Sequence, residues 1–339
     1  MRRTFETAED NTPQALRHPE EAGPPVIEAK KASHVFSRDA GVHDLTFEVP
    51  RGVIFGLIGP SGCGKTTTVR MLTGMYKPTA GEVRVLGQHP VRFSSKTRGK
   101  IGYMPQQFVL YPMLSVAENF NFGASLYGLG VFKRAHRRHQ LLKFVELDRE
   151  RNRVTSKLSG GMQRRLQLAC ALAHDPELLF ADEPTAGIDP VLRSKFWEHF
   201  RLLRDAGKTL FVTTQYVAEA ENCDLVGIMR DGHLLYIDTP EDLRRKAFGG
   251  DLIRLVVPED RTREAVGLLE KHPKVKDARR AYGQHNLILI SAEDAASTMP
   301  DLVKTLTDHG IDVIESEQYN SPFDEVFLEL VKREGDVNV

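Results

Sequence analysis

The strongest constraint on this chain is a glycine-rich segment that stands between a buried strand and a helix. The apolar run Val53–Gly59 is typical of a strand that is covered on both faces. It leads into Gly59-Pro60-Ser61-Gly62-Cys63-Gly64-Lys65-Thr66, and residues 66–73 have helical spacing. This order fits the pattern G-x-x-x-x-G-K-[ST] in the context that the pattern requires. The segment therefore predicts a phosphate-binding loop rather than a chance glycine-rich turn.

The residue types in this loop suit a nucleoside triphosphate. Gly62 and Gly64 allow turns in which successive backbone N–H groups point at phosphate oxygens, and the helix start adds its positive end. Lys65 places a cation between the β- and γ-phosphates, and the Thr66 hydroxyl is a hard oxygen ligand for Mg²⁺. Cys63 occupies a variable position of the pattern and is interpreted as a small filler, not a nucleophile.

A second apolar strand ends in two carboxylates. Leu178–Ala181 is followed directly by Asp182 and Glu183, and in a doubly wound sheet the chemistry lies at the carboxyl ends of strands. We expect Asp182 to hold Mg²⁺ opposite Thr66. Successive strand side chains point to opposite faces, so Glu183 is free to polarise the water that attacks the γ-phosphate. A solvated acid pair is the alternative, and the phosphate loop argues against it.

The pattern of strands and helices divides the chain into three parts. Residues 1–25 are rich in proline and charge and predict a mobile tail. In residues 26–248, buried strands alternate with helical patterns, which predicts a parallel α/β sheet. Residues 249–335 follow the order β-α-β-β-α-β, which predicts a ferredoxin-like domain with a last strand at 311–317 and a short helix after it.

Composition excludes several classes of protein. Lys+Arg and Asp+Glu both number 46, so no global field attracts nucleic acid, and no nucleic-acid partner is expected. The three cysteines form no CxxC pair, which favours a reduced, cytosolic compartment. The first residues lack the apolar core of a signal peptide, and no run approaches the about 18–20 apolar residues of a membrane span. Any membrane part is therefore expected in another chain.

A third motif indicates a family. Leu158-Ser159-Gly160-Gly161-Met162-Gln163 resembles the LSGGQ signature of ABC-transporter ATPases, with Met162 inserted before the glutamine. The resemblance implies that residues 26–248 are a P-loop ABC ATPase domain, with a helical subdomain at about 106–170. It also implies a homodimer in which Lys65 of one subunit and Ser159 of the other hold each ATP.

Further positions resemble landmarks of the same family. Phe36 resembles the aromatic residue that stacks on adenine, with a core aromatic as the alternative. Gln106 resembles the glutamine that senses the metal and γ-phosphate, although Gln107 is a competitor. Asp189 resembles the aspartate that faces the opposite subunit. The implied nucleotide-binding residues are Phe36, Gly59, Ser61, Gly62, Cys63, Gly64, Lys65, Thr66, Thr67, Gln106, Ser159, Gly160, Gly161 and Asp189. The implied Mg²⁺ ligands are Thr66, Gln106 and Asp182.

One position departs from the family pattern. After the strand that ends in Thr213-Thr214, the family usually has a histidine that contacts the γ-phosphate, and here the residue is Gln215. Glutamine still donates a hydrogen bond but does not titrate, so a slower or differently gated hydrolysis is our hypothesis. The sequence Thr213-Thr214-Gln215-Tyr216 and residues 321–330 resemble the corresponding segments of ATPases of multidrug exporters of the daunorubicin-resistance type.

These observations predict the ATP-binding and ATP-hydrolysing subunit of an exporter of drugs or lipid-like molecules. It would lie on the inner face of the cell membrane, with separately encoded permease subunits docked on residues 106–150. Two alternatives stay open. One is an importer ATPase regulated by a ligand of the C-terminal domain, and the other is a soluble ABC ATPase without a transport role. A C-terminal domain that only strengthens the dimer is also compatible with the sequence.

Overall fold

A computed structural model of the chain describes residues 23–37, 40–281 and 283–337. Nearly all of the predicted tail therefore lies outside the described residues. The rest divides into two compact units, and the division falls after Ile237. Helix α8, Pro240–Phe248, belongs to the second unit, where it packs against α11, Phe323–Val337. The predicted ATPase domain, residues 26–248, includes α8 and so extends beyond this division.

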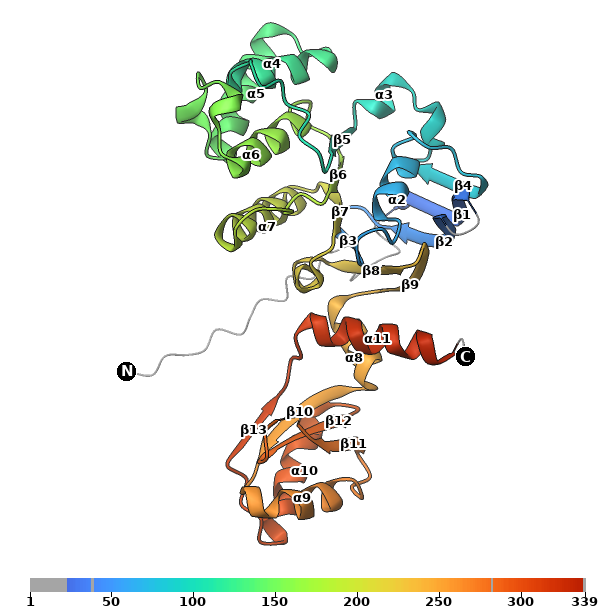
Figure 1. The fold of residues 1–339 in the computed structure, drawn as a ribbon, viewed down its shortest axis with the longest axis vertical. Helices are drawn as coiled ribbons and strands as arrows, with labels where there is room; N and C mark the ends of the chain where they lie inside the picture. Colours follow the sequence, from blue (N-terminus) through green and yellow to red (C-terminus); the bar gives the residue numbers. More distant parts are fainter. Residues whose placement is uncertain (1–22, 38–39, 282, 338–339) are drawn as a thin grey trace. The chain divides into compact units, whose positions relative to one another are not determined.

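The first unit is built on a six-stranded sheet with the order β5-β6-β7-β3-β8-β9 (Figure 1). The pairs from β5 through to β8 are parallel, as predicted for the buried strand runs. Every residue of β3, β6 and β7 is buried, which explains the apolar runs within these strands; their polar residues, such as Asp182 and Thr213, lie at or near the strand ends. The strands are β3 Ile54–Ile58, β5 Ile101–Met104, β6 Leu178–Asp182, β7 Thr209–Thr214, β8 Leu225–Arg230 and β9 His233–Asp238.

The register of this sheet aligns the carboxyl ends of its central strands. Asp182 on β6 pairs with Thr213 on β7, and Thr214 pairs with Ile58 on β3. Helix α2, Lys65–Leu72, follows β3, and helix α7, Pro190–Asp205, lies between β6 and β7 in the chain. The predicted site residues on β3, β6 and β7 therefore reach the same edge of the sheet.

A second sheet of the first unit is antiparallel, with the order β2-β1-β4. Its strands are β1 Ile27–Ser37, β2 Ala40–Val49 and β4 Ala80–Val85. Phe47 of β2 joins the aromatic cluster of the main sheet, where its ring lies 5.8 Å from that of Phe55 and 6.3 Å from that of Phe211. One hydrophobic core therefore spans both sheets.

The helical subdomain extends from the main sheet as α4, α5 and α6, which group together in Figure 1. Their bounds are Val116–Leu126, Val131–Phe144 and Gly160–Ala171, and a shorter helix α3, Ser95–Arg98, precedes β5. Arg137 ties α5 to the end of α6. Its guanidinium donates to the carbonyls of Leu172 and Ala173, which directly follow α6.

The second unit is a four-stranded antiparallel sheet with the order β11-β12-β10-β13. Apolar side chains of β10 and β12, such as Ile253 and Ile290, share a core with residues of α9 and α10. In chain order the elements are β10 Asp251–Val256, α9 Thr262–Leu269, β11 Val275–Arg280, β12 Leu287–Ala292, α10 Ala295–Asp308 and β13 Glu315–Gln318.

The last strand is shorter than the sequence predicted. Residues 311–317 alternate as a strand, yet β13 begins only at Glu315. The reason is the end of α10, because Gly310 has a φ of 70° and the N–H of Ile311 donates to the carbonyl of Leu306. Ile311 therefore closes the helix end, and its buried side chain belongs to the core below the sheet.

Among the described residues, we find no helix whose length and apolar character would allow it to traverse a bilayer.

We expect Asp224 to be a strong stability determinant of the first unit. Its carboxylate accepts hydrogen bonds from the N–H of Ile54, at the start of β3, and from Arg204 on α7. Asp224→Ala removes a buried partner of a charge and should lower the free energy of unfolding by about 3 kcal/mol. Urea unfolding followed by the emission of Trp197, the single tryptophan of the chain, measures this.

Asp205→Asn is the matched control. Asp205 also pairs with Arg204, but its side chain is 59% exposed, so its loss should cost less than about 0.5 kcal/mol. Equal unfolding midpoints for the Asp224→Ala variant and the wild type would show that the buried pair does not hold α7 to the sheet.

Candidate nucleotide site

The predicted phosphate loop connects β3 to α2 and wraps around its own lysine. Gly62 and Gly64 have φ values of 82° and 108°, so the predicted need for glycine at both positions is confirmed. Lys65 is 4% exposed, and its ammonium donates to the carbonyls of Gly59, at 2.8 Å, and Pro60, at 3.0 Å. The loop carbonyls thus satisfy a cation that a phosphate would otherwise bind.

Asp182 and Thr66 meet across the sheet edge as the sequence predicted. Oδ1 of Asp182 accepts hydrogen bonds from the hydroxyls of Thr213, at 2.6 Å, and Thr66, at 3.2 Å. The other carboxylate oxygen, Oδ2, is buried and has no hydrogen-bond partner. A buried, unpaired carboxylate oxygen beside a hydroxyl is a donor set that fits Mg²⁺, which prefers hard oxygen ligands. Burial, with a smaller contribution from Asp182, raises the pKa of nearby Tyr103 to about 12.

Glu183 lies between the lysine and the predicted glutamine. Its Oε1 is 3.5 Å from Nζ of Lys65, and its Oε2 accepts a hydrogen bond from Nε2 of Gln106 at 2.8 Å. Its backbone has a φ of 46°, a conformation fixed by hydrogen bonds from its N–H to Thr213. Gln106 therefore reaches the acid, whereas the carbonyl of Gln107 accepts a hydrogen bond from Gln167.

The residue in the usual histidine position also reaches the phosphate loop. Gln215 follows β7 directly, and its Oε1 accepts a hydrogen bond from the hydroxyl of Ser61 at 2.6 Å. This contact joins segments that are 154 residues apart in the chain. Side chains of Ser61, Lys65, Gln106, Glu183 and Gln215 thus surround one edge of the sheet.

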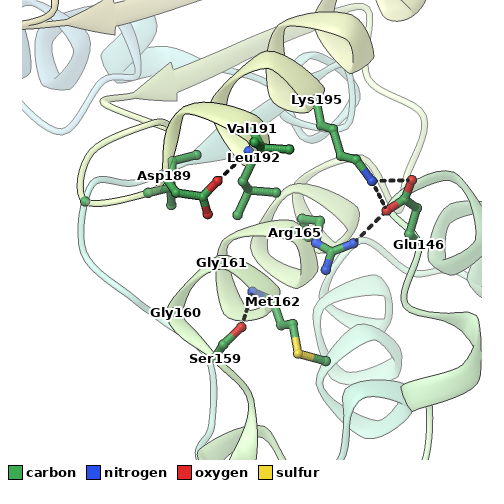
Figure 2. Close-up of a pocket in the computed structure, with 12 residues that line it drawn as sticks. Glu146, Ser159, Gly160, Gly161, Met162, Arg165, Asp189, Val191, Leu192 and Lys195 are labelled. Carbon is green, nitrogen blue, oxygen red and sulfur yellow. Dashed lines mark hydrogen bonds and ion pairs between the residues drawn. The ribbon is translucent and has the colours of Figure 1, made fainter.

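The signature residues lie in a different place. Ser159 caps α6 by accepting a hydrogen bond from the N–H of Met162, and Asp189 caps α7 by accepting one from Leu192. Together with Gly160 and Gly161 they line a pocket that Figure 2 shows. The other lining residues are Glu146, Met162, Arg165, Gly187, Ile188, Val191, Leu192 and Lys195. No residue of the phosphate loop lines this pocket.

Phe36 is not a core aromatic. Phe36 is 56% exposed and lies near the end of β1. Its ring packs edge-on against His34, with centroids 4.7 Å apart, and against Tyr76, at 5.5 Å. An exposed aromatic supported from behind suits a stacking role, which stays a prediction.

Three residues of the site escaped the sequence analysis. The hydroxyl of Thr213 bonds both Asp182, the last residue of β6, and the N–H of Glu183, and Arg164 and Gln167 on α6 donate to the carbonyl of Pro105, next to Gln106. Burial lowers the pKa of the Arg164 guanidinium, and the charges of Glu183 and Asp182 oppose this shift. The sequence contains a pattern that could have indicated Arg164 and Gln167, because residues 160, 164 and 167 share one face of the helix that begins at the signature. Likewise, Thr213 is a hydroxyl residue near the end of a buried strand.

Comparison with known proteins places these features in a family. The family model described as "ABC transporter" matches residues 42–186. The chain is 40% identical over 225 residues to the probable multidrug ABC transporter ATP-binding protein YbhF of Escherichia coli (strain K12). That alignment covers 66% of this chain but only 39% of the relative.

A second relative matches over almost its whole length. The chain is 32% identical to the linearmycin resistance ATP-binding protein LnrL of Bacillus subtilis (strain 168), over 91% of this chain and 99% of the relative. A solved structure of the ATP-binding cassette MJ0796, a dimer in a post-hydrolysis state bound to ADP and Pi, has a TM-score of 0.57. It is 26% identical, and the match covers 63% of this chain and 98% of that one. The chain therefore belongs to the ABC transporter family, among its ATP-binding cassettes, the ABC ATPases.

We expect a side chain at Gly161 to destabilise the first unit more than one at its neighbour Gly160. A Cβ on Gly161 would lie 2.2 Å from Cδ2 of Leu192, whereas a Cβ on Gly160 meets nothing within 4 Å. Gly161→Ala should therefore destabilise the first unit by about 1 kcal/mol, the lower end of overpacking costs. Gly160→Ala should change stability by less than about 0.5 kcal/mol.

Urea unfolding monitored by Trp197 compares these variants, with Leu192→Ala as a second background. Removing the leucine makes room, so Gly161→Ala should cost nothing further there. An undiminished cost in the Leu192→Ala background would contradict the packing argument.

Proposed function

We propose that this chain binds and hydrolyses ATP to drive an exporter of drugs or lipid-like molecules. The observation that carries the proposal is the convergence of Lys65, Gln106, Glu183 and Gln215 around the phosphate loop. Each group is held by at least one contact with another member of the set or with the loop. Such positioned groups stabilise phosphoryl transfer mainly by orientation and charge.

The residues of this site suggest a division of labour. Lys65 would exchange the carbonyls of Gly59 and Pro60 for the β- and γ-phosphate oxygens. Glu183, relieved of Lys65 and Gln106, would orient the attacking water and accept its proton. Gln215 would donate its amide N–H to the γ-phosphate in place of an imidazole.

Thr66, Asp182 and Gln106 are the residues that would hold Mg²⁺, since Asp182 keeps an unpaired buried oxygen. When bound, the ion would neutralise charge on the β- and γ-phosphates. Phe36 would stack on the adenine, because its exposed ring stands free of the core.

A homodimer would complete the site. Ser159, Gly160 and Gly161 at the start of α6 line a pocket without any residue of their own phosphate loop. The N-terminus of a helix of twelve residues favours an anion, so a second copy would present its α6 to the γ-phosphate across a two-fold interface. The similar MJ0796 cassette, which is a dimer with ADP and Pi, supports this arrangement.

A permease partner is supported by exposed apolar side chains on the helical subdomain. Phe132 is 93% exposed and Met113 is 81% exposed, which is unusual for large apolar residues of a folded domain. The others in residues 106–150 are Phe108, Val109, Tyr111, Phe122, Leu126, Tyr127 and Val131. We propose that separately encoded membrane subunits cover this surface and hold the chain on the inner face of the cell membrane.

Export of drugs or lipid-like molecules is supported by the names of the relatives, multidrug transport for YbhF and linearmycin resistance for LnrL. We propose a ferredoxin-like accessory domain for the second unit. Its element order β-α-β-β-α-β and strand order β11-β12-β10-β13 support this fold. No feature of the described residues favours the import alternative over export.

Glu183→Gln should trap a dimer that holds ATP. The amide keeps the shape of the side chain but does not accept the proton of water, so hydrolysis should fall by at least about 100-fold, within the range for a lost general base. Size-exclusion chromatography with Mg-ATP should then show a stable dimer. Glu177→Gln is the control and should behave like the wild type, because Glu177 lies directly before the opposite end of β6 and its side chain is 42% exposed. A Glu183→Gln variant that stays monomeric with ATP would refute the assigned role.

Gln215→His should leave nucleotide binding intact and change how hydrolysis responds to pH. Imidazole titrates near about pH 6.5 in the absence of perturbation, and glutamine does not titrate. The rate for the variant should therefore gain an inflection in this range that the wild type lacks, with an ATP affinity within about threefold, or 0.7 kcal/mol. Fluorescent ATP binding and a pH–rate profile measure both. Loss of binding would show that Gln215 is not the switch residue.

A further inference from the structure

The first turn of α7 contacts two parts of the cassette at once. Asp189 caps this turn, and Leu192 lies against Gly161 of the signature, as Figure 2 shows. The next residue, Arg193, points to the segment after β7. Its guanidinium lies over the ring of Tyr216, 4.1 Å from the centroid, and its Nε is 3.4 Å from Oε1 of Glu219.

Glu219 is a buried acidic residue that has no role in the proposed reaction. It is 3% exposed and lies in a short 3₁₀ helix, Val217–Asn222, directly after Gln215 and Tyr216. Its Oε2 accepts a hydrogen bond from the hydroxyl of Thr185 at 3.0 Å, and its Oε1 faces Arg193. A buried carboxylate needs a countercharge, and Arg193 is the cation that ion-pairs with it among the described residues.

Tyr216 is the covalent neighbour of Gln215, so contacts that hold Tyr216 also restrict the backbone of that glutamine. The backbone N–H of Tyr216 donates to the hydroxyl of Thr214, and Arg193 fixes the ring by stacking. With both ends of the residue held, the chain leaves β7 in one direction. That direction brings Oε1 of Gln215 to the hydroxyl of Ser61.

We propose that Arg193 is a positioning residue for Gln215, and that the first turn of α7 links the signature to this switch. The inference rests on the proposed function, because it gives Gln215 a role at the γ-phosphate. A nucleotide that displaces Gly161 would also displace Leu192, which packs against it, and Arg193 lies in the same turn of α7 as Leu192. Arg193 acts through Tyr216 and Glu219 and has no contact with the phosphate loop of its own.

A double-mutant cycle tests the positioning role. Arg193→Ala should lower kcat for ATP about 10-fold, since a small misplacement of a reacting group costs up to about 100-fold, and should leave KM within twofold. In a Gln215→Ala background the same change should lower kcat by less than twofold, because the group that it positions is gone. Tyr216→Ala should lower kcat to the same extent as Arg193→Ala. Tyr216→Phe, which keeps the ring, should retain the wild-type kcat.

Arg201→Ala is the matched control. Arg201 lies on the same helix and donates to Asn222 at the far end of the 3₁₀ segment, so it shares the helix and the segment but not Tyr216. This variant should keep the wild-type kcat. Arg193→Lys keeps the charge beside Glu219 without the planar group over Tyr216 and should have an intermediate kcat.

The emission of Trp197 gives a readout that does not depend on turnover. Trp197 is the single tryptophan of the chain and lies one helical turn after Arg193 on α7. Mg-ATP should shift its emission in the wild type and in Arg201→Ala, and not in Arg193→Ala, while all three bind a fluorescent ATP analogue with affinities within twofold.

The outcomes separate the two claims. Additive losses of kcat in the cycle, or an ATP-induced emission shift in Arg193→Ala equal to that of the wild type, would overturn the positioning role. A wild-type chain that binds ATP and shows the emission change but never hydrolyses ATP would overturn the proposed function instead, and the emission data would still support the link.

Discussion

The parallel register of β3, β6 and β7 is the constraint on which the candidate site depends. It places Asp182 beside Thr213 and Ile58 beside Thr214, so the phosphate loop, the two acids and Gln215 all leave the sheet at one edge. Thr213 strengthens this arrangement, because its hydroxyl donates to Asp182 and accepts from the N–H of Glu183. A shift of one residue between β6 and β7 would turn these side chains away from each other.

The same register brings buried charged groups together, and these groups need partners. Lys65, Asp182 and Glu183 are all less than 9% exposed, and isolated charges at such depth are costly. Lys65 and Glu183 offset one another, Gln106 bonds the acid, and loop carbonyls bond the ammonium. A triphosphate that enters the site must replace these internal contacts with its own. In this conformation Lys65 and Glu183 are therefore partnered, whereas Oδ2 of Asp182 is buried without a hydrogen-bond partner.

Much of this arrangement could be predicted from sequence, because it depends on local chemistry. Apolar runs predicted β3, β6 and β7, and the glycines of the phosphate loop predicted positive φ values at Gly62 and Gly64. Features that depend on tertiary contacts could not be predicted in the same way. The partners of Thr213, Arg164 and Glu219 come from distant segments, and the bond from the side chain of Gln106 to Glu183 joins segments that are far apart in the chain. The late start of β13 follows from the end of α10, which the alternating pattern of residues 311–317 conceals.

The central claim is that ATP binds between Lys65 of one copy and Ser159 of a second. A crystal structure of the chain with Mg²⁺ and a non-hydrolysable ATP analogue tests this most directly. The account predicts a two-fold dimer with two bound nucleotides, in which the γ-phosphate touches the ammonium of Lys65 and the α6 N-terminus of the other chain. A nucleotide bound by Lys65 while both α6 N-termini face solvent or unrelated surfaces would contradict it.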